Sequence, residues 1–355
     1  MQRDHRNRPA GGSADTHEAD VLSDAIVAVR TGRPHSIRHE LFARWGMHFP
    51  SGEGAGFHVV LRGSCWLIPA EGPPIALKAG DVALVGGELA HGIADSPTSR
   101  LVEFQLGDSH TPYREIRHEG SGPSTVILCG AYLLDRTRIH PVLSELPPVV
   151  HLPAYSGRHP SVHAVVELLA DELDRPQPGM DAIVPSLLDT LLLYIVRAWL
   201  DERSHDESTA GWIAALSDPA ITSALSAIHH DVTHPWTVEE LGQRAGLSRA
   251  AFARRFTTLI GQPPLAYLTW WRMITAARLL RESDVPLRVV ARQAGYSSEI
   301  AFAAAFKREH GVSPGRYRRP SSKDVAAGHQ SSDPAEDDRF VVADDRAWSL
   351  LIERS

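Results

Sequence analysis

The chain has 355 residues and a formal net charge of −7, with 43% apolar and 22% charged residues. At roughly 100–200 residues per domain, this length predicts two or three domains, and the composition is that of a globular protein rather than a disordered or fibrous one. Two cysteines can build neither a disulfide framework nor a four-cysteine zinc site, which favours a reducing, cytoplasmic location. The charged N-terminal segment lacks the apolar core of a signal peptide. The most apolar run, residues 187–200, is interrupted by two charges and is too short to cross a bilayer. We therefore expect no membrane partner.

The N-terminal segment predicts a leader and one helix. Residues 1–19 are charged and rich in Gly and Ala, which predicts a disordered leader. In residues 21–30 apolar side chains recur at helical spacing, and this predicts a short helix.

Short apolar runs separated by Gly and Pro dominate the next hundred residues. The runs are residues 57–61, 65–68, 75–77, 82–85, 101–106 and 126–129. Strand-length runs at this spacing predict an all-β barrel or sandwich. We place it, with its flanking helices, in a domain of residues 20–205.

Two helices are predicted after the strands. Residues 161–173 carry one apolar stripe, and residues 181–202 carry a stripe wider than one core-facing side needs. A stripe of this width fits packing on both the barrel and a second subunit, which would make the protein a homodimer. A helix that is simply buried gives the same pattern, and the sequence leaves the two interpretations open.

The charge is unevenly distributed. Residues 222–320 carry a formal charge of +7 and the remainder carries −14. A basic module on an acidic chain favours a polyanion such as nucleic acid as its partner, although a solvated charged face gives the same balance. We expect a linker at residues 206–220, a helical domain at residues 221–319 and a disordered, Ser/Asp-rich tail at residues 320–355.

The helical domain contains an internal repeat. Val238, Leu241, Ala245 and Gly246 recur 49 positions later as Leu287, Val290, Ala294 and Gly295, and Phe252, Phe256, Gly261 and Pro264 recur 50 positions later as Phe302, Phe306, Gly311 and Pro314. The change from 49 to 50 places one extra residue in the turn of the second copy.

Each copy predicts a helix–turn–helix. In the first copy Thr237 and Glu240 form a capping-box pattern, Gly246 ends the first helix, Ser248 caps the second and Gly261 stops it.

The second copy follows the same plan. Pro286 suits a first helical turn, and Gly295 makes the turn. Residues 265–282 form one long helix that joins the two copies.

At this point the sequence resembles the AraC/XylS family of transcriptional regulators. The resemblance covers about Ile221 to Arg319 and includes the specific signature Phe306–Arg318. It implies two helix-turn-helix units whose recognition helices enter successive major-groove segments, about one helical turn apart. It also implies promoter DNA and RNA polymerase as partners.

In the first recognition helix Phe252 and Phe256 face inward. The outward positions are then Arg249, Ala250, Ala253, Arg254 and Thr257. Arg254 stands where the family commonly places an arginine, which implies a bidentate guanine contact worth about 1–3 kcal/mol of discrimination. Ala250 and Ala253 suit thymine methyl groups, and Arg249 and Arg255 suit phosphates. A surface charge or an intramolecular ion pair is the alternative for each arginine.

The second recognition helix offers fewer hydrogen bonds. Its outward positions are Glu299, Ile300, Ala303 and Ala304, followed by the phosphate candidates Lys307, Arg308, Arg316 and Arg318. We therefore expect this unit to add phosphate affinity and thymine-methyl contacts but little base specificity.

Residues 21–203 resemble the cupin-type sensor domains that precede such DNA-binding units. The matching segments are Phe57–Leu67, Leu77–Val85, Ala90–His91 and Leu146–His151. The fold class is therefore α+β, with an N-terminal cupin-like β-barrel and flanking helices followed by an all-α double helix-turn-helix domain.

A metal site in the barrel is incomplete by the standard of enzymatic cupins, which use a His-x-His pair, a Glu and a later His. His58 is followed by Val59 and Val60, so the pair is absent, whereas His91 stands where the later histidine would be. His58, His91 and Cys129 can together hold a soft metal ion. The alternative is two hydrogen-bonded core histidines and a buried apolar cysteine.

We predict a one-component, effector-responsive, sequence-specific transcriptional regulator without enzymatic activity. Its effector is a small molecule, a metal ion or a redox signal, although the apolar contexts of Cys65 and Cys129 argue against a reactive thiol. The main alternative is a metal-binding cupin enzyme with an accessory helical domain, which the incomplete ligand set weakens. A helical protein–protein adaptor is the third, and it would not need the arginines after Gly246.

Overall fold

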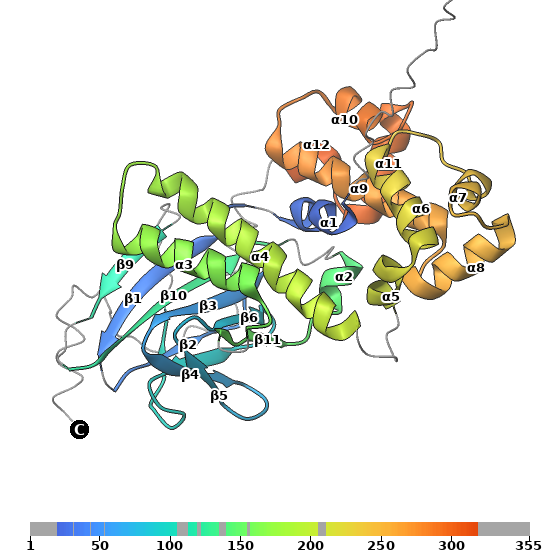
Figure 1. The fold of residues 1–355 in the computed structure, drawn as a ribbon. Coiled ribbons are helices and arrows are strands. Elements are labelled where there is room, and N and C mark those ends of the chain that lie inside the picture. The colour runs from blue at the N-terminus through green and yellow to red at the C-terminus, as the bar shows by residue number, and fades with distance from the viewer. Residues whose placement is uncertain are drawn as a thin grey trace, which may run out of the picture.

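The computed structural model describes residues 20–30, 32–42, 44–52, 54–104, 113–118, 122–134, 140–154, 157–204 and 211–318. The predicted leader and the predicted tail lie outside these residues. A β-rich N-terminal part is followed by an entirely helical C-terminal part (Figure 1). This confirms the α+β fold class.

The strands form two sheets. The six-stranded sheet has the order β11 (Val149–Leu152), β6 (Val82–Gly86), β3 (Ala55–Arg62), β10 (Ser124–Tyr132), β1 (His35–Phe42) and β9 (Tyr113–Arg117). The five-stranded sheet has the order β5 (Ile75–Lys78), β4 (Ser64–Pro69), β7 (His91–Ala94), β2 (Gly46–Phe49) and β8 (Val102–Glu103). Neighbours pair antiparallel except β1 with β9 and β2 with β8. This order makes Cys129 on β10 the cross-strand partner of His58 on β3.

The central strands of the six-stranded sheet are buried on both faces. Its inner face meets the other sheet through side chains such as Val60, Ile127 and Ile93. Its outer face, including Phe57 and Leu128, packs on helices α3 (Pro160–Asp174) and α4 (Met180–Ser204), which cover the sheet in Figure 1. Burial of apolar surface at about 25 cal/mol per Å² holds these layers together.

Helix α4 is both long and rich in apolar residues. By length and composition alone, its segment Met180–Arg203 is able to cross a membrane, and half of its most apolar window is buried within the protein. The buried half includes Leu188, Leu191 and Ile195, as expected of a helix that packs on a core. Ile183 on α4 and Leu168 on α3 remain 42% and 57% exposed.

The C-terminal part is a chain of eight helices among the described residues. They are α5 (Gly211–Ser217), α6 (Pro219–His230), α7 (Val238–Arg244), α8 (Arg249–Ile260), α9 (Pro264–Glu282), α10 (Leu287–Gln293), α11 (Glu299–His310) and α12 (Pro314–Arg318). The interval 206–220, expected as a linker, therefore contains α5 and the start of α6. Trp212 and Ile213 are buried there, so this segment is packed rather than extended. Residues 205–210 lie outside the description.

Two short N-terminal elements lie against the helical part. Helix α1 (Val21–Val29), which the sequence predicts and which Asp20 caps, contacts α6 and α9. Arg281 on α9 donates to the carbonyl oxygens of Ala28 and Arg30. Helix α2 (Pro141–Ser144) contacts α5. The two parts therefore share one continuous apolar core.

Several strands were not expected from the sequence. The predicted runs near residues 57, 65, 75, 82 and 126 all form strands, whereas the described portion of the run 101–106 forms only β8. Strands β1, β2, β9 and β11 were missed. In β1, buried Arg38 and His39 break the apolar pattern, and Arg38 is tolerated because it pairs with Glu115 and with Asp174 at 2.9 Å.

Candidate nucleic-acid interface and barrel site

Local hydrogen bonds build the first helix-turn-helix unit as predicted. Thr237 Oγ1 accepts from the Glu240 backbone amide at 3.1 Å, and Glu240 Oε2 accepts from the Thr237 amide at 2.8 Å, which confirms the capping box. Gly246 takes a left-handed φ of 66° after the last turn of α7. Ser248 Oγ then accepts from the Ala251 amide at 3.4 Å to begin α8.

Helix α8 has one buried and one exposed face. Phe252 and Phe256 are fully buried. The predicted DNA-contacting side chains of this helix lie on the opposite, accessible side: Arg249, Ala250, Arg254, Arg255 and Thr257 are exposed and Ala253 is half-buried. The Thr257 hydroxyl donates to the Ala253 carbonyl oxygen at 2.7 Å, so its oxygen keeps only the capacity to accept a further hydrogen bond.

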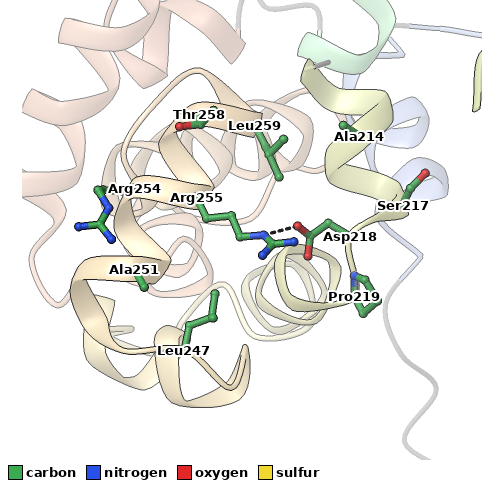
Figure 2. Close-up of a pocket in the computed structure, with 10 residues that line it drawn as sticks. All are labelled: Ala214, Ser217, Asp218, Pro219, Leu247, Ala251, Arg254, Arg255, Thr258 and Leu259. Atoms are coloured by element: carbon green, nitrogen blue, oxygen red, sulfur yellow. Dashed lines mark hydrogen bonds and ion pairs between the residues drawn. The ribbon is translucent and has the colours of Figure 1, made fainter. Parts of the chain in front are cut away.

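The adjacent arginines Arg254 and Arg255 differ in their partners. Arg255 Nε donates to Asp218 Oδ2 at 2.5 Å, and the same carboxylate caps α6 by accepting from the Ala220 and Ile221 amides. Arg254 is exposed and has no side-chain partner among the described residues. Figure 2 shows Arg254 pointing away from the Arg255–Asp218 pair.

A solvent-open hollow of about 900 Å³ lies beside the exposed face of α8. It is bounded by residues of α5, α6 and α8, and the Arg255–Asp218 pair crosses it (Figure 2). Leu247 and Leu259 supply apolar walls. Helix α8 is thus open to solvent on this side from Ala251 to Leu259.

The second unit repeats the construction with one difference at its start. Pro286 is the residue before α10 rather than a residue of its first turn, a position where its missing amide again costs nothing. Gly295 has a φ of 77° and makes the turn. Ser298 caps α11 by accepting from the Ala301 amide at 3.4 Å.

The exposed face of α11 is mostly apolar and small. Ile300 is 83% exposed, Glu299 and Ala304 are exposed and Ala303 is half-buried. Because Ile300 is this exposed on a helix whose Phe302 and Phe306 are buried, it contributes little to packing within the protein.

The cationic candidates at the end of this unit differ in availability. Lys307, Arg308 and Arg316 are exposed. Arg318 Nη2 instead donates to the Val285 carbonyl oxygen at 2.6 Å. Arg318 therefore ties α12 to the loop before α10.

The three predicted barrel residues lie together between the sheets. His58 Nδ1 is 3.1 Å from Cys129 Sγ, and His58 Nε2 is 2.7 Å from His91 Nε2. His91 Nδ1 is 3.1 Å from the Leu89 carbonyl oxygen. Burial lowers the pKa of His58 well below its usual value and also lowers the pKa of His91, so both rings are neutral.

Neutral rings fix the direction of every hydrogen bond in this chain. The Leu89 oxygen only accepts, so His91 Nδ1–H donates to it and His91 Nε2 is an acceptor. His58 Nε2–H then donates to His91, which leaves His58 Nδ1 to accept from the Cys129 thiol. Every polar side-chain group of His91, His58 and Cys129 therefore has a hydrogen-bond partner, as in a hydrogen-bonded core.

This arrangement is not a preformed metal centre. The described residues contain no group of three or more His, Cys, Asp or Glu side chains placed to hold a metal ion. Cys129 and His91 approach opposite nitrogens of the His58 ring, so the three donors do not converge on one point. A soft metal at these residues stays a prediction, and its binding would require the Cys129 thiol proton to leave, whereas each neutral imidazole already has one unprotonated nitrogen.

Both thiols are buried, and neither forms a disulfide bond. Burial raises the pKa of Cys65 to about 12 and that of Cys129 well above its usual value. A protonated thiol is a poor nucleophile, in keeping with the sequence argument against a reactive cysteine.

Two contacts of the helical part carried no signal in the sequence. Asp218 lies 37 residues before Arg255, and Arg272 on α9 contacts carbonyls 38 to 40 residues earlier. Only the folded arrangement of α6, α8 and α9 reveals them.

Comparisons with known proteins agree with both halves of this description. Residues 20–201 match a family described as Cupin, and residues 241–320 match a family described as Helix-turn-helix domain. A putative AraC-like transcription regulator of Streptomyces antibioticus is 33% identical over 305 residues, covering 84% of this chain and 98% of the relative. The transcriptional regulator AlkR of Acinetobacter baylyi is 29% identical, with 85% of this chain and all of the relative covered. The DNA-binding domain of AdpA, solved in complex with a target DNA, is 39% identical over 28% of this chain and 90% of that chain, with a TM-score of 0.27.

Proposed function

Because the chain belongs to the AraC/XylS family of transcriptional regulators, we propose that it recognises its operator through exposed side chains of α8 and α11 and responds to an effector in its β-barrel. We propose domain boundaries at residues 20–205 for the cupin-like sensor and at 221–319 for the DNA-binding domain. Members of this family bind DNA through their helix-turn-helix units, and we start from that property. The residue assignments and the effector are the proposal.

The observation that carries the proposal is the contrast between Arg254 and Arg255. An arginine that reads a guanine needs both terminal nitrogens free for the O6 and N7 acceptors. Arg254 is exposed on the outward face of α8 without a partner among the described residues, whereas Arg255 is paired with Asp218. Arg254 is therefore the base-reading residue, and a phosphate contact by Arg255 has to compete with a carboxylate.

The remaining positions of α8 offer fewer hydrogen bonds to bases than Arg254 does. Ala250 and Ala253 offer methyl groups to thymine, Arg249 lies at the start of the helix within reach of the phosphate backbone, and Thr257 offers an acceptor.

Helix α11 is proposed as the weaker reader. Exposed Ile300 and Ala304, with half-buried Ala303, offer apolar contact to thymine methyls, and Glu299 accepts from a cytosine amino group. Lys307, Arg308 and Arg316 supply phosphate contacts, which raise affinity in a salt-dependent and sequence-independent way. Arg318 is already engaged with Val285.

The sensor part is proposed to bind its effector at the inner face of the barrel. The His58, His91 and Cys129 chain offers one thiol and two imidazoles, which suit a soft metal ion, a small molecule that replaces one of the hydrogen bonds, or an oxidant. The fully satisfied hydrogen bonds favour the second class, because a metal ion or an oxidant requires the thiolate that burial disfavours.

Other partners follow from the same proposal. Leu168 on α3 and Ile183 on α4 are exposed apolar side chains, which supports homodimerisation through the 161–203 helices. RNA polymerase is the expected protein partner, and the cytoplasm is the expected location. We propose no catalytic activity, since the named relatives are transcriptional regulators.

Competition binding tests the proposal. The full chain is titrated onto labelled DNA from upstream of its own gene, at near-physiological salt and with excess random DNA. We expect a complex that survives the competitor, because sequence-specific binding exceeds non-specific binding by about 10³-fold or more. Complete displacement by random DNA would contradict sequence-specific recognition.

A further inference from the structure

A single arginine on the connecting helix contacts both helix-turn-helix units. Helix α9 lies between the units, with Trp271 and Ile274 in the apolar core shared with the first unit and Met273 and Ala276 in the core of the second. Arg272 stands between these residues and is half-buried.

Towards the first unit, Arg272 holds the loop that leads into α7. Its Nε donates to the Val232 carbonyl oxygen at 2.9 Å, and its Nη2 donates to the His234 carbonyl oxygen at 2.8 Å. A planar guanidinium can donate to both carbonyl oxygens at once from different nitrogens, whereas the single ammonium group of a lysine does not match this geometry.

That loop is itself rigidly attached to the first unit. Asp231 accepts from the Thr233 and His234 amides at 3.1 and 3.0 Å, and the Trp236 indole donates to the Asp231 carbonyl oxygen at 2.9 Å. The Trp236 ring also packs under the guanidinium of Arg244 on α7. The hydrogen bonds of Arg272 to this loop therefore connect α9 to α7.

Towards the second unit, Arg272 lies against the turn between α10 and α11. A Cβ atom on Gly295 would lie 2.8 Å from Arg272 Nε and 2.9 Å from its Cζ and Nη2. The turn is tied to α10 by the Tyr296 amide, which donates to the Ala291 carbonyl oxygen at 2.8 Å, and to α11 by packing of Tyr296 on Phe302.

The internal repeat supplies the matched comparison. Gly246 is the counterpart of Gly295 in the first unit and has a similar positive φ, 66° against 77°. A Cβ atom on Gly246 would meet nothing within 4 Å. The close contact with an arginine is thus particular to the second turn.

We propose that Arg272, seated between the 232–234 loop and Gly295, is a positioning residue that fixes the angle between α8 and α11 and thereby sets which operator spacing the protein recognises. The inference rests on the proposed use of both helices. One added base pair rotates the second DNA segment by roughly 35° and moves it by roughly 3.4 Å. Two helix-turn-helix units held at a fixed angle lose binding affinity when the spacing changes by one base pair. Two units that can move relative to each other lose less.

The experiment measures binding of the full chain to its operator, first located by footprinting, and to versions with one base pair added or removed between the two protected segments. We expect the wild type to lose about tenfold or more in affinity at either altered spacing. Arg272→Ala and Gly295→Ala should bind the native spacing more weakly and lose less than about threefold at the altered spacings. Arg272→Lys should lie between.

Two matched controls isolate the contact. Gly246→Ala carries the same backbone strain without touching Arg272, and Arg288→Ala removes an exposed positive charge from α10. Both should keep the wild-type ratio between native and altered spacings, whatever they do to overall affinity. Thermal unfolding of each variant establishes that it is folded.

The outcomes separate this inference from the proposed function. If Arg272→Ala and Gly295→Ala keep the full wild-type spacing penalty, the positioning role is overturned while DNA recognition stands. If Gly246→Ala relaxes the spacing as much as Gly295→Ala, strain rather than Arg272 is responsible and the role is again overturned. If the wild type shows no preference for any operator, the proposed function itself fails.

Discussion

The Tyr267 hydroxyl on α9 lies 2.7 Å from His229 Nε2 on α6 and 3.3 Å from His140 Nε2, which precedes α2. His229 Nδ1 lies 3.2 Å from the Asp24 carboxylate on α1, and His140 Nδ1 accepts from the Val142 amide. With neutral rings, the bonds run in one direction from Val142 to Asp24. A continuous hydrogen-bond chain therefore joins segments of the N-terminal part to the helices of the DNA-binding part.

Tyr267→Phe removes the central group of this chain. His229 Nε2 then loses its donor and His140 Nε2–H loses its acceptor in a buried site, so we expect a loss of about 1–3 kcal/mol in the free energy of unfolding. Urea denaturation measures it. Tyr194→Phe is the control, because its hydroxyl has no partner among the described residues, and its effect should stay within about 0.5 kcal/mol. Equal effects of the two substitutions would refute the role of the chain.

The same chain predicts acid sensitivity. Burial lowers the pKa of His140 well below 6.5 and lowers that of His229 despite the opposing Asp24 carboxylate. The unfolded protein therefore binds more protons than the folded protein below pH 6.5. The stability contributed by these neutral histidines is complete above pH 6.5 and is lost as the pH falls. Each histidine contributes a loss of at most about 1.4 kcal/mol per pH unit, and only between pH 6.5 and its own lowered pKa.

Thermal and urea unfolding at pH 7.5 and 5.5 test this dependence. His229→Gln, which keeps polar atoms but cannot titrate, should lose less stability between the two pH values than the wild type. An unchanged pH dependence in this variant would exclude His229 from the effect.

Arg254→Ala should weaken operator binding far more than binding to random DNA. Loss of a bidentate guanine contact costs about 1–3 kcal/mol on the operator only. Arg255→Ala serves as the matched control, because its guanidinium is held by Asp218. Fluorescence anisotropy on both DNAs measures the ratio. Equal losses on operator and random DNA would reassign Arg254 to a phosphate.

Substitution of Ala303 and Ala304 by serine should change the preferred DNA sequence little. The exposed surface of α11 is apolar at Ile300 and offers few hydrogen-bonding groups, so its contribution is mainly contact with methyl groups and phosphates. Selection of bound sequences from a random pool compares the variant with the wild type. A marked shift in the selected motif would contradict the assignment of α11 as the weaker reader.

Cys129→Val and Cys129→Ser distinguish a hydrogen-bonded core from a metal site. Valine leaves His58 Nδ1 without its donor and should cost about 1–3 kcal/mol, whereas the serine hydroxyl replaces the thiol as donor and should cost less. The wild type should retain no zinc after dialysis. Stoichiometric zinc in the wild type, lost in both variants, would instead establish the metal site at His58, His91 and Cys129.

The sequence predicts the parts of this protein that depend on local signals. The Thr237–Glu240 capping box, Gly246 and Gly261 act within one or two turns, so their roles in ending helices follow from spacing alone. The gathering of His58, His91 and Cys129 was expected from family resemblance. The directions of the hydrogen bonds among these three residues follow only from the folded structure.

The features missed by the sequence depend on distant partners. Strand β1 carries buried Arg38, which is stable there only because Glu115 and Asp174 meet it. Helix α5 lies in a segment expected as a linker, and it forms because Trp212 finds a buried place beside Tyr267. No local pattern encodes such contacts, since each pairs residues far apart in the chain.

The most direct test of the account is a hydroxyl-radical footprint of the full, reduced and chelator-treated protein on DNA upstream of its gene. We predict two protected segments per subunit, about one helical turn apart on one face of the duplex. In Arg254→Ala, protection should weaken first in the segment occupied by α8. A single protected segment, or uniform protection without boundaries, would contradict recognition by two helix-turn-helix units.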